Sequence, residues 1–274
     1  MPEGPEIRLA ADKVGAAIEG RALSGVFFAF DRLKNWEASL TGCRVERVET
    51  RGKAMLIRVG GVAIYSHNQL YGRWFTTKNR RPPKTTRQLR LGLETASGAA
   101  WLYSASAIEV LAEGTEDTYP PLARLGPDPL HDEVTAADIR VRLRDRRFSG
   151  RQLAGLYLDQ GFLAGIGNYL RSEILWHARV HPAARPRELP GARVAALARA
   201  SLLLPRRSYA TRGVTRDARS AARLRARGVP RGRWRFQVFG QAGQACPRCD
   251  EPVVREDWTG RRLYRCPACQ PEAE

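Results

Sequence analysis

Cys246-Pro-Arg-Cys249 and, sixteen residues further on, Cys266-Pro-Ala-Cys269 lie near the end of this chain of 274 residues. Each Cys-x-x-Cys turn can direct two thiolates toward one tetrahedral metal ion, so this pairing predicts a zinc site. Four protein ligands leave no open position for a substrate, so we expect one structural Zn²⁺. The alternative is two disulfides or redox dithiols, which the lack of a secretion signal disfavours.

The segment between the two cysteine pairs is predicted to form a β-hairpin. The apolar pairs Val253-Val254 and Leu263-Tyr264 flank the turn dipeptide Thr259-Gly260. Such a hairpin is too small to fold without a metal anchor. Zinc units of this kind occur in many proteins that bind nucleic acids, so a non-catalytic zinc-ribbon binding protein is one alternative for the function.

The charge of the chain indicates a polyanionic partner. Its 46 Lys and Arg residues against 28 Asp and Glu residues give a net charge of +18, and the sequence pI is 10.6. These values are typical of proteins that bind nucleic acids. No run of about 18 apolar residues and no leader segment is evident, so we expect a soluble, cytoplasmic protein that does not enter a membrane.

The first half of the chain has the pattern of one helix followed by short strands. Ile7, Ala11, Val14 and Ile18 mark one face of a helix over residues 5–19. Repeated short β-rich segments then predict a sandwich or barrel. The predicted strands are 22–30, 43–50, 54–66, 72–77, 87–94 and 99–104.

The second half of the chain changes to helical periodicity after the proline-rich stretch from Pro120 to Pro129. We expect a domain boundary near 125–132 and, from Arg206 to Arg235, a basic connector with little apolar periodicity. The predicted helices span about 135–147, 152–159, 168–178 and 191–205. The expected domains are 1–128, 129–215, the basic connector 216–233 and the zinc finger 234–274.

Two further motifs carry a resemblance to a known family. The chain begins Met1-Pro-Glu-Gly-Pro-Glu-Ile7 and contains Leu163-Ala-Gly-Ile-Gly-Asn-Tyr-Leu-Arg-Ser-Glu-Ile-Leu-Trp176. Together with the charge and the four cysteines, these motifs resemble the formamidopyrimidine-DNA glycosylase and endonuclease VIII family over nearly the whole length, and most closely its bacterial endonuclease VIII branch. The resemblance implies an α+β multidomain fold, with an N-terminal β-sandwich and helix, a helix-two-turns-helix domain and a C-terminal zinc finger.

The resemblance also implies a bifunctional DNA glycosylase and AP lyase that acts in base-excision repair. Once Met1 is removed, the amine of Pro2 attacks the sugar, and Glu3 is the proton donor. An α-amino group titrates near ~7.7 to 8.0, so a useful fraction is neutral at cellular pH. Lys53 matches the lysine that the family assigns to the first elimination as a proton donor. Gly52, the residue before it, permits a tight turn of the backbone. Arg261 matches the arginine of the second elimination.

The resemblance also implies a set of DNA contacts, which include a wedge that is needed because the damaged nucleotide is flipped out of the helix. A flipped nucleotide leaves a gap in the stack that a wedge must fill. Gln69, Leu70 and Tyr71 match the wedge of endonuclease VIII, which implies oxidised pyrimidines as substrates. Arg124 and Asn168 match backbone contacts, although Asn168 could also be a helix N-cap. Glu173, on the same helix, is a weaker match for a residue that interacts with the Pro2 amine.

The expected partner is double-stranded DNA that contains damaged bases or abasic sites, and we expect the chain to act as a monomer. The nearest alternative function is a glycosylase for oxidised purines such as formamidopyrimidine or 8-oxoguanine. The connector is more basic than the family pattern. It either adds salt-sensitive, sequence-independent affinity for DNA or is a solvated loop.

Overall fold

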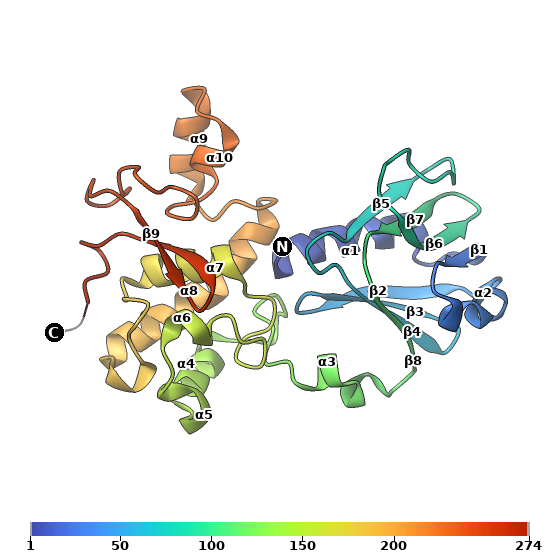
Figure 1. Cartoon of the computed structure of the whole chain (residues 1–274), viewed down its shortest axis with the longest axis horizontal. Helices are drawn as coiled ribbons and strands as arrows, with labels where there is room; N and C mark the ends of the chain where they lie inside the picture. The colour runs from blue at the N-terminus through green and yellow to red at the C-terminus, as the bar shows by residue number, and fades with distance from the viewer. Residues whose placement is uncertain (1, 273–274) are drawn as a thin grey trace. The chain divides into compact units, whose positions relative to one another are not determined.

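The computed structural model describes residues 2–272, which divide into two units with their boundary between Arg124 and Leu125 (Figure 1). Each unit has its own buried apolar core. Within the described residues, no helix combines the length and the apolar character that crossing a bilayer requires.

The N-terminal unit is a sandwich of two antiparallel sheets, as predicted. Their inner faces share one core with the apolar face of helix α1 (Gly4–Ile18). One sheet has the order β1-β6-β7-β5 and the other β2-β3-β4-β8. The strands are β1 (Leu23–Phe28), β2 (Val45–Arg51), β3 (Ala54–Val59), β4 (Val62–His67), β5 (Arg73–Thr77), β6 (Leu89–Thr95), β7 (Ala99–Tyr103) and β8 (Ala107–Ala112).

Three features of this unit differ from the prediction. The segment 54–66 was predicted as one strand, but Gly60 and Gly61, both with positive φ, turn the chain and give β3 and β4. Because both strands are almost wholly buried, their apolar runs join in the sequence without a polar break. The prediction also missed β8 and a set of short helices: η1 (Asp31–Leu33), α2 (Asn35–Leu40), η2 (Glu116–Thr118) and α3 (Pro120–Ala123).

The second unit is helical and ends in a two-stranded hairpin. Helix α7 (Asn168–Ala178) is almost entirely buried and packs on α8 (Gly191–Ala210) and on the hairpin. The remaining elements are α4 (Ala136–Arg144), α5 (Arg146–Ser149), α6 (Leu153–Leu156), η3 (Pro186–Glu188), α9 (Ala218–Ala226), α10 (Arg231–Trp234), β9 (Val254–Trp258) and β10 (Arg261–Arg265).

Helix α8 continues past Pro205, where the prediction ended it. A proline inside a helix removes one backbone hydrogen bond. Here tertiary packing compensates, because Leu204, Pro205 and Ser208 are buried and the Ser208 hydroxyl lies 2.9 Å from the hydroxyl of Tyr169. Packing therefore overrides the local helix-breaking signal.

The predicted connector 216–233 contains regular structure that its composition did not suggest. Asp217 caps α9 by accepting a hydrogen bond of 2.9 Å from the backbone N–H of Ser220. An aspartate at this position satisfies an N–H group that the helix itself leaves unpaired. The prediction for this segment rested on its run of charged residues and did not use Asp217 as an N-cap signal.

Candidate active site and zinc finger

The N-terminal residues are held by a reciprocal cap at the start of α1. The Glu3 side chain accepts the backbone N–H of Glu6, and a Glu6 carboxylate oxygen accepts the backbone N–H of Glu3 at 3.0 Å. Glu3 is 3% exposed, whereas Pro2 is half-buried. The cap fixes the backbone next to Pro2, because both Glu3 and Glu6 belong to it. The removal of Met1 concerns a residue outside the described range.

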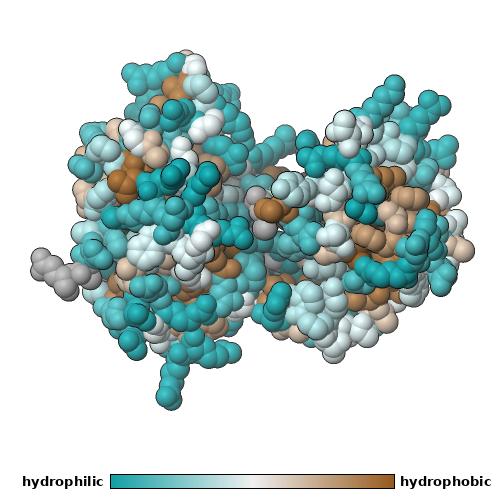
Figure 2. Space-filling model, viewed as in Figure 1, coloured by the Kyte–Doolittle hydropathy of each residue, from teal (hydrophilic) through white to brown (hydrophobic). Residues whose placement is uncertain are grey.

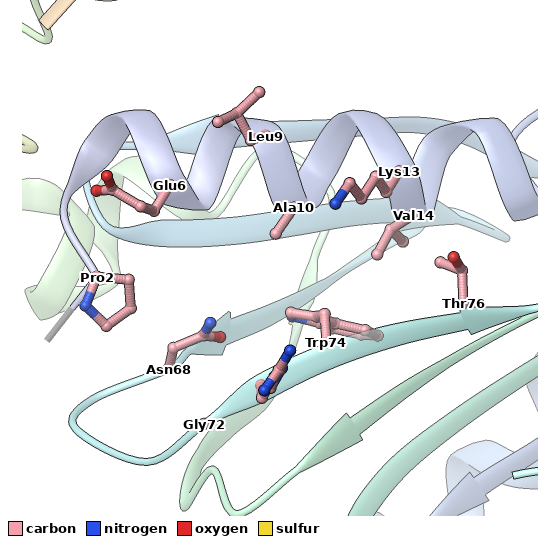
Figure 3. Close-up of a pocket in the computed structure, with 11 residues that line it drawn as sticks. Pro2, Glu6, Leu9, Ala10, Lys13, Val14, Asn68, Gly72, Trp74 and Thr76 are labelled. Carbon is pink, nitrogen blue, oxygen red and sulfur yellow. The ribbon is translucent and has the colours of Figure 1, made fainter. Parts of the chain in front are cut away.

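A cavity of about 290 Å³ opens beside Pro2 (Figure 3). Pro2 and Glu6 line it from the start of α1, and Asn68 and Gly72 line it from the loop that follows β4. The Asn68 side chain lies across the cavity from the Pro2 ring. The N-terminus and the loop that carries the predicted wedge therefore meet at one cavity.

The predicted wedge residues are presented on a tight loop. Gln69 has a φ of 51°, and its side-chain oxygen accepts the Ser106 hydroxyl at 2.6 Å. Leu70 and Tyr71 are 56% and 70% exposed. Two adjacent large apolar side chains that extend from a loop into solvent suit insertion into a base stack.

His67 supports this loop. Its Nδ1 atom accepts the backbone N–H of Gln69 at 3.0 Å. Burial, and then the positive charge of Lys53, lower the pKa of His67. A lowered pKa keeps the imidazole neutral near pH 7, which is the form that can accept this hydrogen bond.

Lys53 lies in the two-residue turn between β2 and β3. Gly52 has a φ of 61°, and the strands pair up to Arg51 and Ala54. The predicted role of Gly52 in this turn is therefore confirmed. Lys53 is half-buried and lies close enough to His67 to affect its pKa. Arg124 is exposed at the end of α3 and is the last residue of the first unit.

In the second unit, Asn168 is the first residue of α7, and Gly167 occupies the N-cap position. The alternative role of Asn168 as the N-cap is therefore wrong. Its side-chain oxygen instead accepts a hydrogen bond of 2.7 Å from the guanidinium of Arg171. This bond orients the Asn168 amide nitrogen away from Arg171.

Arg171 is a buried residue with a structural role that the prediction missed. It is fully buried and donates to the carbonyls of Ala154 at 2.8 Å and of Arg262 at 3.1 Å. Arg171 thereby joins α6, the start of α7 and the zinc-finger hairpin. The signal in the sequence is an arginine among the apolar residues Tyr169, Leu170 and Ile174 of α7, and a charge is rarely buried unless it is paired.

Glu173 is buried on α7 and holds a loop. Its carboxylate accepts the Thr215 hydroxyl at 2.6 Å and the backbone N–H groups of Gln237, Val238 and Phe239 at 2.8 to 2.9 Å. Hydrogen bonds to an ionised carboxylate are among the stronger ones in proteins. The structure thus gives Glu173 a role in ordering residues 237–239.

The four cysteines of the second unit form one cluster. Their sulfur atoms all lie within 4.8 Å of one another, with Cys246 to Cys269 at 3.8 Å and Cys249 to Cys266 at 3.4 Å. A tetrahedral zinc site with Zn–S bonds of about 2.3 Å has sulfur–sulfur separations of roughly 3.8 Å. The cluster therefore fits one structural zinc ion, and the cysteines are not paired in disulfides.

The zinc cluster is tied to α7 and carries the predicted hairpin. The Trp176 indole donates to the Cys246 sulfur at 3.3 Å. Strands β9 and β10 meet at Thr259 and Gly260, both with positive φ, as a two-residue hairpin requires. Arg261, the first residue of β10, is exposed beside this turn, as is its neighbour Arg262.

Comparison with known proteins agrees with this architecture. Residues 1–104 match the formamidopyrimidine-DNA glycosylase N-terminal domain, and residues 125–213 match the formamidopyrimidine-DNA glycosylase H2TH domain. Endonuclease 8 of Salmonella dublin is 46% identical over 271 residues, which covers 98% of this chain and all of the relative. The chain belongs to the formamidopyrimidine-DNA glycosylase and endonuclease VIII family. Endonuclease 8 of Enterobacter sp. (strain 638) is 45% identical over the same length.

Solved structures of the family share the fold. A complex of Lactococcus lactis Fpg with DNA that contains an abasic site has a TM-score of 0.80 at 20% identity, and the match covers 98% of this chain and all of that one. A complex of MutM with DNA that contains carbocyclic 8-oxo-G has a TM-score of 0.80 at 21% identity, covering 99% and 100%. At this identity the likeness concerns the fold alone, including the β-sandwich, the helix-two-turns-helix domain and the zinc finger.

Proposed function

We propose that this chain removes oxidised pyrimidines from double-stranded DNA through a Schiff base on the amine of Pro2. The chain is a DNA-repair enzyme, a bifunctional DNA glycosylase and AP lyase, since it is 46% identical to endonuclease 8 over the full length of that enzyme. The observation that carries the proposal within this class is the cavity where Pro2 faces the loop of Gln69, Leu70 and Tyr71.

The first chemical step breaks the bond between the sugar and the damaged base. The lone pair of the Pro2 nitrogen attacks C1′, and the base departs with the electrons of the glycosidic bond. Two protons are needed, one on the leaving base and one on the sugar ring oxygen when the bond between C1′ and that oxygen breaks. Glu3 supplies one of them, and the N–H proton that Pro2 loses on forming the iminium with C1′ supplies the other. Its place in the α1 cap gives Glu3 a fixed position beside the nucleophile.

The iminium then drives strand cleavage. It acidifies the proton on C2′, and loss of that proton expels the 3′ phosphate as the first elimination. We propose that Lys53 donates a proton in this stage, and that Arg261 binds the phosphate during the second elimination. A guanidinium is permanently charged, so it is better suited to clamping a phosphate than to donating a proton. Zinc holds the hairpin that carries Arg261 and takes no part in these steps.

The remaining contacts are with the DNA around the lesion. We propose that Gln69, Leu70 and Tyr71 fill the gap left by the flipped nucleotide, and that Arg124 and Asn168 bind the sugar-phosphate backbone. The exposure of Leu70 and Tyr71 supports the first role. The net charge of +18 supports a polyanionic partner. We further propose that the chain acts as a cytoplasmic monomer associated with the DNA of the cell.

The choice of substrate is tested by comparing two lesions. Excision rates under single-turnover conditions are measured on duplexes of one sequence that carry either thymine glycol or 8-oxoguanine. We expect thymine glycol to be removed at least about tenfold faster, a difference of roughly 1.4 kcal/mol in the activation barrier. Faster excision of 8-oxoguanine would instead place the chain among the enzymes for oxidised purines.

A further inference from the structure

Residues 217–233, here called the basic lobe, have no part in the proposed chemistry. The lobe contains α9 and most of α10, and the family domains matched above end at residue 213. In the space-filling view, hydrophilic side chains line the outer edge of the region where Figure 1 places these two helices (Figure 2).

One group of arginines anchors the lobe to its own unit. Arg216 is buried and donates to the carbonyls of Trp234 at 3.0 Å and Phe236 at 2.8 Å. Arg231 donates to a carbonyl at 2.6 Å and Arg235 to another at 3.1 Å, and both acceptors lie just before the lobe. Hydrogen bonds therefore link the start and end of the lobe to its flanking backbone, which holds α9 in place.

A second group of arginines in the lobe is not among these anchoring residues. All five are exposed, and the part of the chain that the structure describes gives none of them a carboxylate partner. The only acidic residue of the lobe, Asp217, is engaged as the cap of α9. These arginines are Arg219, Arg223, Arg225, Arg227 and Arg233.

Three of these arginines form a row along α9 and its C-cap. Arg219 and Arg223 lie on α9, and Arg227 is the C-cap residue, whose backbone N–H still donates to the Arg223 carbonyl at 3.3 Å. The spacing of four residues places them along one side of the helix, about 6 Å apart along the axis. The opposite side, with Ala221 and Leu224, is half-buried. Like charges at this spacing destabilise an isolated helix, and a bound row of phosphates would relieve that repulsion.

We propose that the row of Arg219, Arg223 and Arg227 binds the sugar-phosphate backbone of duplex DNA, in addition to the DNA contacts proposed above. This inference rests on the proposed function only in taking duplex DNA as the ligand. Guanidinium groups bind phosphate oxygens in bidentate geometry. Contacts to phosphate oxygens fix the position of a protein on the duplex but carry no information about the base sequence. Binding through it is therefore independent of sequence and of damage.

The test is the salt dependence of DNA binding. The variant with Arg219→Gln, Arg223→Gln and Arg227→Gln is compared with the wild type on lesion-containing and undamaged duplexes of the same sequence. Each lost phosphate contact lowers the slope of log K against log salt by about 0.9. We expect the slope of the glutamine variant to be smaller than that of the wild type by about 2 to 3. The variant should lose affinity by the same factor on both duplexes, and its excision rate at saturating enzyme should be unchanged.

Two matched variants control for charge and for fold. Arg140→Gln, Arg146→Gln and Arg199→Gln remove the same charge from exposed positions of the same unit, and we expect them to leave the slope nearly unchanged. Replacing the row by three lysines should preserve most of the slope. An unchanged slope in the glutamine variant, an equal effect in the control, or a loss confined to damaged DNA would overturn the proposal. A wild type that binds no DNA would instead contradict the proposed function.

Discussion

Replacing Glu3 by glutamine is expected to reduce excision of an intact damaged base by about 10²- to 10⁴-fold, the usual contribution of a positioned acid. Glutamine keeps the size and the hydrogen-bonding oxygen of the side chain, so it can still accept the backbone N–H of Glu6 in the α1 cap. It cannot deliver a proton to the sugar or to the leaving base. The measurement is a single-turnover excision rate on a duplex that contains thymine glycol.

A preformed abasic site separates this role from a structural one. The base is already absent there, so the first protonation is not needed, and the Glu3→Gln variant should lose much less of its lyase activity than of its glycosylase activity. Equal losses on both substrates would show that Glu3 acts by holding the N-terminus in place. Full activity on the intact lesion would remove Glu3 from the mechanism.

Removing zinc is expected to prevent the zinc finger from binding damaged DNA. The affinity of the whole chain for DNA should fall by at least about tenfold. The hairpin β9–β10 is too short to hold its fold alone, and Arg261 depends on it for its position. The buried guanidinium of Arg171 would also lose the carbonyl of Arg262. The measurement is DNA affinity after chelation and again after zinc is restored.

The control for zinc removal is a cysteine outside the finger. Cys266→Ser should reproduce the effect of chelation, whereas Cys43→Ser, on the first unit, should leave affinity unchanged. At saturating enzyme, the zinc-free protein should stop mainly after the first elimination, because the second elimination is assigned to Arg261. Normal affinity and complete strand processing without zinc would contradict the assigned role of the finger.

Local patterns in the sequence were sufficient to predict much of the fold. The apolar spacing of Ile7, Ala11 and Val14 predicts α1, and the two Cys-x-x-Cys turns predict the zinc finger. These signals are local and come from a helical period or from ligand spacing. Features that depend on tertiary packing were missed, such as the continuation of α8 past Pro205 and the edge strand β8.

The candidate site shows the same division between local and tertiary information. Pro2, Glu3, Lys53 and the wedge lie in short motifs that the resemblance to the family singles out. The partners that position these residues do not lie in such motifs. His67 accepts the Gln69 N–H, and Arg171 connects Asn168 to the zinc hairpin. The contact between Arg171 and the Arg262 carbonyl exists only in the folded chain, because it joins α7 to β10.

The most direct test of the central claim is the position of the covalent bond to DNA. Enzyme mixed with duplex that contains an abasic site is treated with borohydride, which reduces an iminium to a stable amine, and the crosslinked peptide is identified by mass spectrometry. We predict that the sugar is attached to the nitrogen of Pro2, and that a chain retaining Met1 gives no crosslink. Attachment to Lys53 or another lysine, or the absence of any crosslink, would contradict the assignment of Pro2 as the nucleophile.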